Sequence, residues 1–263
     1  MEVIIRPDAQ SAARLTAELL VRQVRTKPDS VLGLATGRTM ERVYTELVRM
    51  YTSGDVDFSR CRTFNLDEYV GLPPDDPGSY CFYMNDKLFQ HINIDPANTH
   101  FPNGLAADFQ SECNRYEDIM RVCGGIDLQL LGIGKSGHIG FNEPLSALRS
   151  RTREKALTPT TIEQNAPLFP SPDEVPRRGV TMGVGTILDS RQCLLLATGR
   201  EKANIIARAL EGPVTSMISA TALQLHPACR VIVDENAAAE LTQKDYYRWI
   251  FENEPEWRTF QSV

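Results

Sequence analysis

The amino-acid sequence predicts an α/β fold, a three-layer, doubly wound, Rossmann-like arrangement in which helices cover both faces of a mostly parallel sheet. Two observations predict it. Short apolar runs alternate with longer segments of helical periodicity, which is the order of βαβ units. The apolar runs are almost continuously hydrophobic, as in parallel strands that are covered on both faces. We expect one domain over residues 1–263.

The strands and helices are predicted from these patterns. The strands are expected at residues 2–5, 31–35, 61–66, 126–131, 193–197 and 230–233. Residues 41–51 and 201–210 are expected to be helices, because apolar side chains recur on one face of each. Those faces carry Val43, Tyr44, Leu47 and Met50 in the first segment, and Ile205, Ile206 and Ala209 in the second.

A proline-rich segment interrupts this pattern at residues 159–176. Its five prolines predict neither a regular helix nor a central strand. A long irregular segment in a compact domain is either a lid over a site or a surface excursion, and composition alone leaves both open. The prolines are Pro159, Pro167, Pro170, Pro172 and Pro176.

Composition and charge exclude several classes of function. The formal net charge of −6 provides no basic field for nucleic acid. No apolar stretch approaches the ~18 residues that cross a bilayer, and the N-terminus lacks the pattern of a secretory signal, so we expect no membrane association. The six cysteines form no C-x-x-C pair, which favours reduced thiols and a cytoplasmic location.

Common cofactor and nucleophile motifs are also missing. The four histidines have no spacing typical of metal ligands, so no metal site is expected. The first strand is not followed by G-x-G-x-x-G, and no G-x-S-x-G occurs, which argues against dinucleotide and serine-hydrolase chemistry.

Two strand-to-helix turns resemble anion sites. The turn of Thr36, Gly37, Arg38 and Thr39 offers backbone N–H groups, hydroxyls and a cation. The alternative is a plain turn in which Thr39 caps the helix. Gly199 is followed by Lys202, which either reaches an anion as a point charge or is simply solvated at a helix start.

Two further strand ends carry candidate acid–base groups. Asp67 and Glu68 follow the third strand. They are either helix caps or solvated groups, or, in the apolar setting of residues 69–73, they include a proton-transfer base. His138 lies among four glycines in GIGKSGHIGFNEP (residues 132–144). A lone histidine is often structural, but Glu143 five residues later could orient its ring for acid–base catalysis.

Taken together, GLATGRT, TFNLDEYVGLP, GIGKSGHIGFNEP, SRTREKALT, GVGTILD and LQLHP resemble the glucosamine-6-phosphate deaminase family, in the same order along nearly the whole chain. The resemblance implies conversion of glucosamine 6-phosphate and water to fructose 6-phosphate and ammonia, with no cofactor. It implies that Asp67 moves a proton from carbon 2 to carbon 1, that His138 assists ring opening, and that Glu143 holds His138. The sugar phosphate would bind Thr36, Gly37, Arg38, Thr39 and Lys202, and the segment at about 158–178 would be a mobile lid.

Three features depart from the family pattern. Ser136 stands where allosteric deaminases have aspartate, so the imidazolium form of His138 would be less favoured. Arg38 and Met40 replace the glycine and proline of the usual phosphate turn. The lid arginine that normally reaches the phosphate falls at Pro167. We hypothesise that Arg38 supplies the missing guanidinium; the alternative is that it points to solvent.

The resemblance also bears on assembly and regulation. Ser146, Arg153 and Lys155 match positions that bind the activator N-acetylglucosamine 6-phosphate in allosteric members. A homo-oligomer is implied, with a hexamer favoured. Four alternatives stay open: a galactosamine-6-phosphate deaminase, a 6-phosphogluconolactonase of the same broad fold, the sugar-phosphate sensor of a repressor, and a catalytically weak sugar-phosphate-binding protein. The lactonase sequence differs after the Gly-His pair, and the repressor needs a DNA-binding segment for which the first strand leaves no room.

Overall fold

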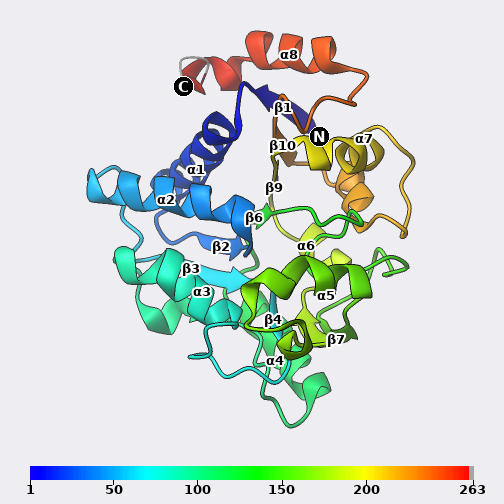
Figure 1. The fold of residues 1–263 in the computed structure, drawn as a ribbon. Coiled ribbons are helices and arrows are strands. Elements are labelled where there is room, and N and C mark those ends of the chain that lie inside the picture. Colours follow the sequence, from blue (N-terminus) through cyan, green and yellow to red (C-terminus); the bar gives the residue numbers. More distant parts are fainter. Residues whose placement is uncertain (261–263) are drawn as a thin grey trace.

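A seven-stranded sheet forms the centre of the computed structural model, which describes residues 1–260 (Figure 1). Its order is β1-β10-β9-β6-β2-β3-β5, and all neighbouring strands are parallel. The predicted parallel sheet is confirmed, and each predicted strand overlaps a strand of this sheet. The strands are β1 (Glu2–Arg6), β2 (Val31–Leu34), β3 (Arg62–Asn65), β5 (Thr99–His100), β6 (Leu128–Leu131), β9 (Cys193–Ala197) and β10 (Cys229–Asp234).

Helices surround this sheet, with α1 and α2 on one side of it and α7 on the other (Figure 1). The two predicted helices lie in α2 and α7, and their expected apolar faces are buried. The α-helices are α1 (Ala9–Thr26), α2 (Arg38–Thr52), α3 (Tyr80–Lys87), α4 (Phe109–Val122), α5 (Pro159–Asn165), α6 (Val184–Leu188), α7 (Ala203–Leu210) and α8 (Lys244–Asn253). The 3-10 helices are η1 (Phe89–His91), η2 (Pro96–Asn98), η3 (Ala166–Leu168), η4 (Pro172–Glu174), η5 (Arg200–Lys202), η6 (Ser219–Leu225) and η7 (Pro255–Phe260).

A second, antiparallel sheet of three strands was not predicted. It consists of β4 (Asp67–Tyr69), β8 (Arg178–Thr181) and β7 (Arg153–Ala156), in the order β4-β8-β7. The strands are three or four residues long, and β7 (REKA) has no apolar alternation, so the sequence carries no strand signal for them. The sheet places Asp67, one of the predicted site residues, at the first position of a strand.

The expectation that residues 159–176 contain no regular helix is wrong. Helix α5 begins at Pro159, which needs no backbone N–H in the first turn of a helix. The Thr158 side chain caps it by accepting a hydrogen bond from the Thr161 amide. The next proline in the chain, Pro167, lies beyond the last helical residue, so the helix interior contains none. The remainder of the segment contains only the 3-10 helices η3 and η4.

The remaining sequence expectations concern cysteines, metals, membranes and domain extent. All six cysteines are free, and four of them are buried. Within residues 1–260, no group of His, Cys, Asp and Glu side chains could hold a metal ion. In the same residues, no helix is long and apolar enough to span a membrane. A single domain over residues 1–263 stays a prediction, and residues 261–263 lie outside the described part of the chain.

Candidate active site

A pocket opens where the direction of the sheet connections reverses. Strands β2 and β6 are neighbours in the sheet. The chain continues from β2 to β3 on one side of this pair, and the strand that follows β6 in the main sheet, β9, lies on the other side. The loops after β2 and β6 therefore diverge, which is where open α/β sheets bind ligands. A cavity of about 430 Å³ lies here, and it is lined by seven of the predicted site residues: Thr36, Gly37, Arg38, Thr39, Asp67, His138 and Lys202.

The first loop forms the start of α2. Gly37 is the N-cap residue, with a φ of 116° that few non-glycine residues adopt, and Arg38 is the first helical residue. Thr39 thus lies inside the helix, so the alternative in which Thr39 caps it is wrong. The Tyr83 hydroxyl donates a hydrogen bond to the Gly37 carbonyl at 2.9 Å and fixes the turn. The first turn of this helix lines the pocket, at the place where the sequence predicts an anion site.

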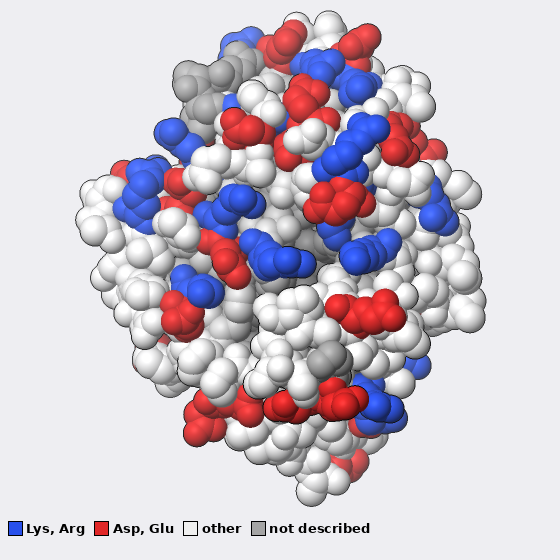
Figure 2. Space-filling view, viewed as in Figure 1, with Lys and Arg blue, Asp and Glu red and all other residues white. Residues whose placement is uncertain are grey.

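Four cationic side chains line the pocket: Arg38, Arg42, Lys135 and Lys202. Lys202 Nζ donates to the Ile133 carbonyl at 2.7 Å, which anchors the side chain beside the second loop. Burial lowers the pKa of Lys202, and the nearby Lys135 and Arg38 lower it further. Within residues 1–260, Arg38 and Lys135 form no ion pair. Figure 2 shows Lys and Arg side chains around the hollow on this face of the molecule.

Asp67 and Glu68 are adjacent but have different partners. The Glu68 carboxylate accepts hydrogen bonds from the backbone N–H groups of Tyr69, Tyr80 and Cys81 at 2.8–2.9 Å, so it caps the start of α3. The helix-cap alternative is therefore correct for Glu68. Asp67 instead lines the pocket and is only 6% exposed. Burial, with a smaller contribution from Glu68, raises the pKa of Asp67 to about 8.

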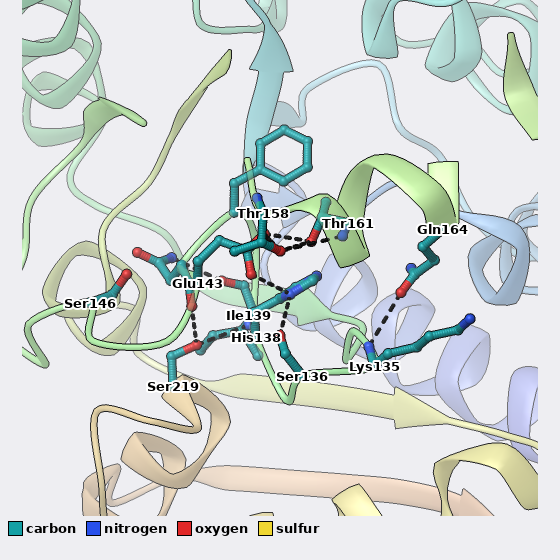
Figure 3. Close-up of polar contacts among 12 residues, drawn as sticks. Lys135, Ser136, His138, Ile139, Glu143, Ser146, Thr158, Thr161, Gln164 and Ser219 are labelled. Carbon is teal, nitrogen blue, oxygen red and sulfur yellow. Dashed lines mark hydrogen bonds and ion pairs between the residues drawn. The ribbon is translucent and has the colours of Figure 1, made fainter. Parts of the chain in front are cut away.

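His138 lies between Ser136 and Glu143, as Figure 3 shows. Its Nδ1 is 2.8 Å from Ser136 Oγ and 3.3 Å from Glu143 Oε2. Because both neighbours contact Nδ1, the other ring nitrogen, Nε2, is available to a bound molecule. Ser136 and Glu143 do not line the pocket, so they act on it through His138.

Two glycines make room for these groups. A β-carbon at Gly134 would lie 2.0 Å from His138 Nε2, so any side chain there would displace the imidazole. Gly140 has a φ of 55°, and a β-carbon there would lie 2.9 Å from Thr181 Oγ1 and 3.4 Å from Asp67 Oδ2. The glycines of this stretch therefore let the loop approach His138 and Asp67 closely.

The three predicted activator residues are only partly together. Arg153 donates hydrogen bonds to Ser146 Oγ at 3.0 Å and to Asn142 Oδ1 at 2.8 Å. Lys155 is exposed on the same strand, β7, and forms no ion pair with any residue in 1–260. All three residues lie outside the pocket.

The sequence interpretation did not select several pocket residues. Lys135 was passed over although it lies inside the quoted glycine-rich stretch, where its charge was a visible signal. Thr161, Gln164 and Asn165 line the pocket from α5. The family resemblance implies a lid over this segment, but the sequence does not single out these three residues. Tyr80 lines the pocket from the start of α3. Pro167 is exposed and does not line the pocket.

Comparison with known proteins assigns the family. Residues 8–239 match the family model of the glucosamine-6-phosphate isomerases and 6-phosphogluconolactonases. The chain belongs to this family. The glucosamine-6-phosphate deaminase of Hahella chejuensis is 49% identical over 250 residues, covering 95% of each chain. That of Cellvibrio japonicus is 51% identical over 251 residues, again covering 95% of each.

Solved structures of the family agree with the fold. The chain superposes on a monomeric glucosamine-6-phosphate deaminase with a TM-score of 0.90 at 44% identity, covering 91% of this chain and all of the other. It also superposes on the 6-phosphogluconolactonase of Trypanosoma brucei with a TM-score of 0.68, at 18% identity and 92% and 98% coverage. The second likeness concerns the fold alone. Among these relatives the deaminase branch is far nearer in sequence than the lactonase.

Proposed function

We propose that this chain is a glucosamine-6-phosphate deaminase that converts glucosamine 6-phosphate and water to fructose 6-phosphate and ammonia. The family membership and the deaminase relatives at 44–51% identity support it. The observation that carries the proposal is a buried carboxyl group, Asp67, that lines the same pocket as His138 and Lys202. These groups supply a base, a ring-opening acid–base group and a phosphate-binding cation.

Asp67 is proposed to carry the proton from carbon 2 to carbon 1 of the opened sugar. With a pKa of about 8, it is mostly protonated at neutral pH in the free protein. The substrate brings an ammonium group on carbon 2, and a positive charge close to a carboxyl favours its ionised form. Binding of the amino sugar would therefore generate the base that the reaction needs. A sugar without the amine would not provide this charge.

His138 is proposed to open the pyranose ring by moving a proton at the ring oxygen through Nε2. Burial opposes ionisation of Glu143, but its interactions with His138 and Thr161 outweigh that effect and lower its pKa to about 2, so the carboxylate stays charged. A fixed carboxylate 3.3 Å from Nδ1 orients the imidazole and stabilises its protonated form during proton transfer. Ser136 Oγ gives Nδ1 a second polar neighbour at 2.8 Å.

The sugar phosphate is proposed to lie on the turn of Thr36, Gly37, Arg38 and Thr39, with Lys202 opposite. Arg38 starts a helix whose position is set by the sheet, and its side chain forms no ion pair within residues 1–260. Pro167 provides no cation and is exposed outside the pocket. These observations support the hypothesis that Arg38 supplies the guanidinium that the lid lacks. The segment 158–178 is proposed as the lid, because α5 lines the pocket.

A coupled assay for ammonia release from glucosamine 6-phosphate tests the proposal. We expect turnover by the purified chain and its loss in Asp67→Asn. Parallel turnover of galactosamine 6-phosphate distinguishes the two amino sugars, and hydrolysis of 6-phosphogluconolactone tests the other branch of the family. Binding of glucosamine 6-phosphate without ammonia release would contradict the proposal and favour a sugar-phosphate-binding protein.

Assembly and regulation form a separate part of the proposal. We propose a cytoplasmic homo-oligomer, with a hexamer favoured, in which Ser146, Arg153 and Lys155 bind N-acetylglucosamine 6-phosphate. The proximity of Ser146 and Arg153 supports a shared anion site. A 44% identical relative is described as monomeric, so sedimentation of this chain is the direct test of its subunit number. A sigmoidal rate curve that the activator makes hyperbolic would support regulation, whereas a hyperbolic curve that does not respond to it would contradict it.

A further inference from the structure

The Glu143 carboxylate joins His138 to helix α5. Its Oε2 faces His138 Nδ1 at 3.3 Å. Its Oε1 accepts hydrogen bonds from Thr161 Oγ1 at 2.5 Å, from Thr158 Oγ1 at 3.0 Å and from the Thr158 backbone N–H at 3.3 Å. Figure 3 shows these contacts converging on the carboxylate. Within residues 1–260 it has no other hydrogen-bond or ion-pair partner, so α5 holds the side of the carboxylate that His138 does not contact.

Thr161 is suited to hold a charged group. The residue is 2% exposed, and its hydroxyl points from the first turn of α5 to Glu143. A hydroxyl that donates to a carboxylate makes a stronger hydrogen bond than one between neutral groups, and water cannot easily replace it at a buried position. Glu143 itself is 5% exposed. Without the Thr161 hydroxyl, Oε1 would keep only the two longer contacts to Thr158.

The other end of α5 is fastened independently of Glu143. Asn165 Nδ2 donates to the Tyr69 hydroxyl at 2.7 Å, and Asn165 is 9% exposed. Tyr69 belongs to β4, the strand that also carries Asp67. Helix α5 therefore stays attached to the pocket through Asn165 when the Thr161 hydroxyl is removed, so the effect of that hydroxyl on Glu143 can be measured separately.

We propose that Thr161, assisted by Thr158, is a positioning residue for the acid–base reaction, because it holds the Glu143 carboxylate in the place from which it orients His138. Helix α5 then contributes to proton transfer as well as covering the pocket. The inference rests on the proposed deaminase function, in which His138 opens the sugar ring. It assigns a role to two threonines whose side chains donate hydrogen bonds to Glu143.

The test compares Thr161→Val, which replaces the hydroxyl with a methyl of similar size, with Thr161→Ser, which keeps the hydroxyl. In the ammonia assay we expect Thr161→Val to lower kcat about tenfold, with KM changed by less than about twofold, since a hydrogen bond to a charged group is lost while the phosphate site is intact. Thr161→Ser should restore most of the activity. The matched control, Thr160→Val, alters an exposed neighbour in the same helix and should behave as wild type.

A second comparison asks whether Thr161 acts through Glu143. In a Glu143→Gln background the carboxylate is already removed, so adding Thr161→Val should change the residual kcat by less than about twofold. Amide exchange at Ile162, whose N–H donates to the Thr158 carbonyl at 3.0 Å, reports whether α5 is still folded. If Thr161→Val unfolds the helix, Thr161→Ala, which adds no bulk, takes its place in both comparisons.

Three results would overturn the inference: a wild-type kcat in the variant without the hydroxyl, a loss that Thr161→Ser does not restore, or an equal loss in the Glu143→Gln background. Failure of the proposed function would be seen separately, because the wild-type chain would then release no ammonia.

Discussion

The buried carboxyl group of Asp67 should make the free energy of unfolding depend on pH, and the substitution Asp67→Asn should remove this dependence. Its folded-state pKa is about 8 against an ordinary value of 3.8, and burial is the main cause. A carboxyl whose pKa is raised by folding favours the folded state when it is protonated. Its contribution to stability is therefore fully present below about pH 4 and is lost as the pH rises through about 8. Asp67→Asn keeps the size of the side chain but cannot ionise.

The size of the effect follows from the two pKa values. Between them, the free energy of unfolding falls by about 1.4 kcal/mol for each pH unit because of this group alone. From pH 5 to pH 8 the stability of Asp67→Asn relative to wild type should therefore increase by up to about 4 kcal/mol, and it should level off above about pH 9. Local relaxation and entry of water around the ionised carboxylate reduce this figure, so it is an upper limit.

Urea unfolding at pH 5, 6, 7, 8 and 9, followed by the fluorescence of Trp249 and the buried Trp257, measures this difference. Glu163→Gln is the matched control, since Glu163 is an exposed carboxyl in α5 and its neutralisation should give a nearly constant difference. The same Asp67→Asn protein should lose about a thousandfold in kcat if Asp67 is the base. A stability difference that is equal at pH 5 and pH 8 would refute the reasoning that burial keeps this carboxyl protonated.

Three further substitutions test other parts of the pocket. Arg38→Ala should raise KM for glucosamine 6-phosphate about tenfold with little change in kcat, because a phosphate contact is lost; an unchanged KM would place the side chain in solvent. Gly134→Ala should abolish turnover in a protein with normal circular dichroism, since its β-carbon would lie 2.0 Å from His138 Nε2; retained turnover would contradict this close approach of the loop to the imidazole. Ser136→Asp adds a carboxylate beside His138 Nδ1 and should move the pH–rate profile to higher pH, and an identical profile would show that this charge is irrelevant.

The main sheet was predictable from sequence because its strands are buried on both faces. Residues 193–197 (CLLLA) are apolar throughout, and all five are buried in β9. The antiparallel sheet was not predictable, since the three residues of β4 (DEY) are buried by contacts with β8 and by aromatic neighbours far away in sequence. Proline content alone does not reveal helix α5, because Pro159 occupies the first turn, where a proline does not disturb a helix.

The candidate site was predictable to the extent that its residues follow strands. Asp67, His138 and Lys202 come after β3, β6 and β9, and parallel strands bring their carboxyl ends to one edge. The distinction between Asp67 and Glu68 was not predictable, because it depends on the backbone N–H groups of α3 that donate to Glu68. The hydrogen bonds from Thr158 and Thr161 to Glu143 were also not predictable from sequence, because they depend on α5 and on its position beside the pocket.

Two parts of the fold carry the groups proposed to bind the substrate and the groups proposed to orient His138. Substitutions in the two parts should therefore change different kinetic constants. Arg38, Lys135 and Lys202 lie on or beside the loops that follow the strands, so the positions of the anion-binding groups are set by the central sheet. In a chain of net charge −6, these local cations are proposed to supply the attraction for a sugar phosphate that the overall charge does not. The Glu143 carboxylate is held by α5, which lies outside that sheet. Changes at the cations should therefore act mainly on KM, and changes at Thr161 mainly on kcat, because one set of groups holds the substrate and the other orients the proton-transfer group.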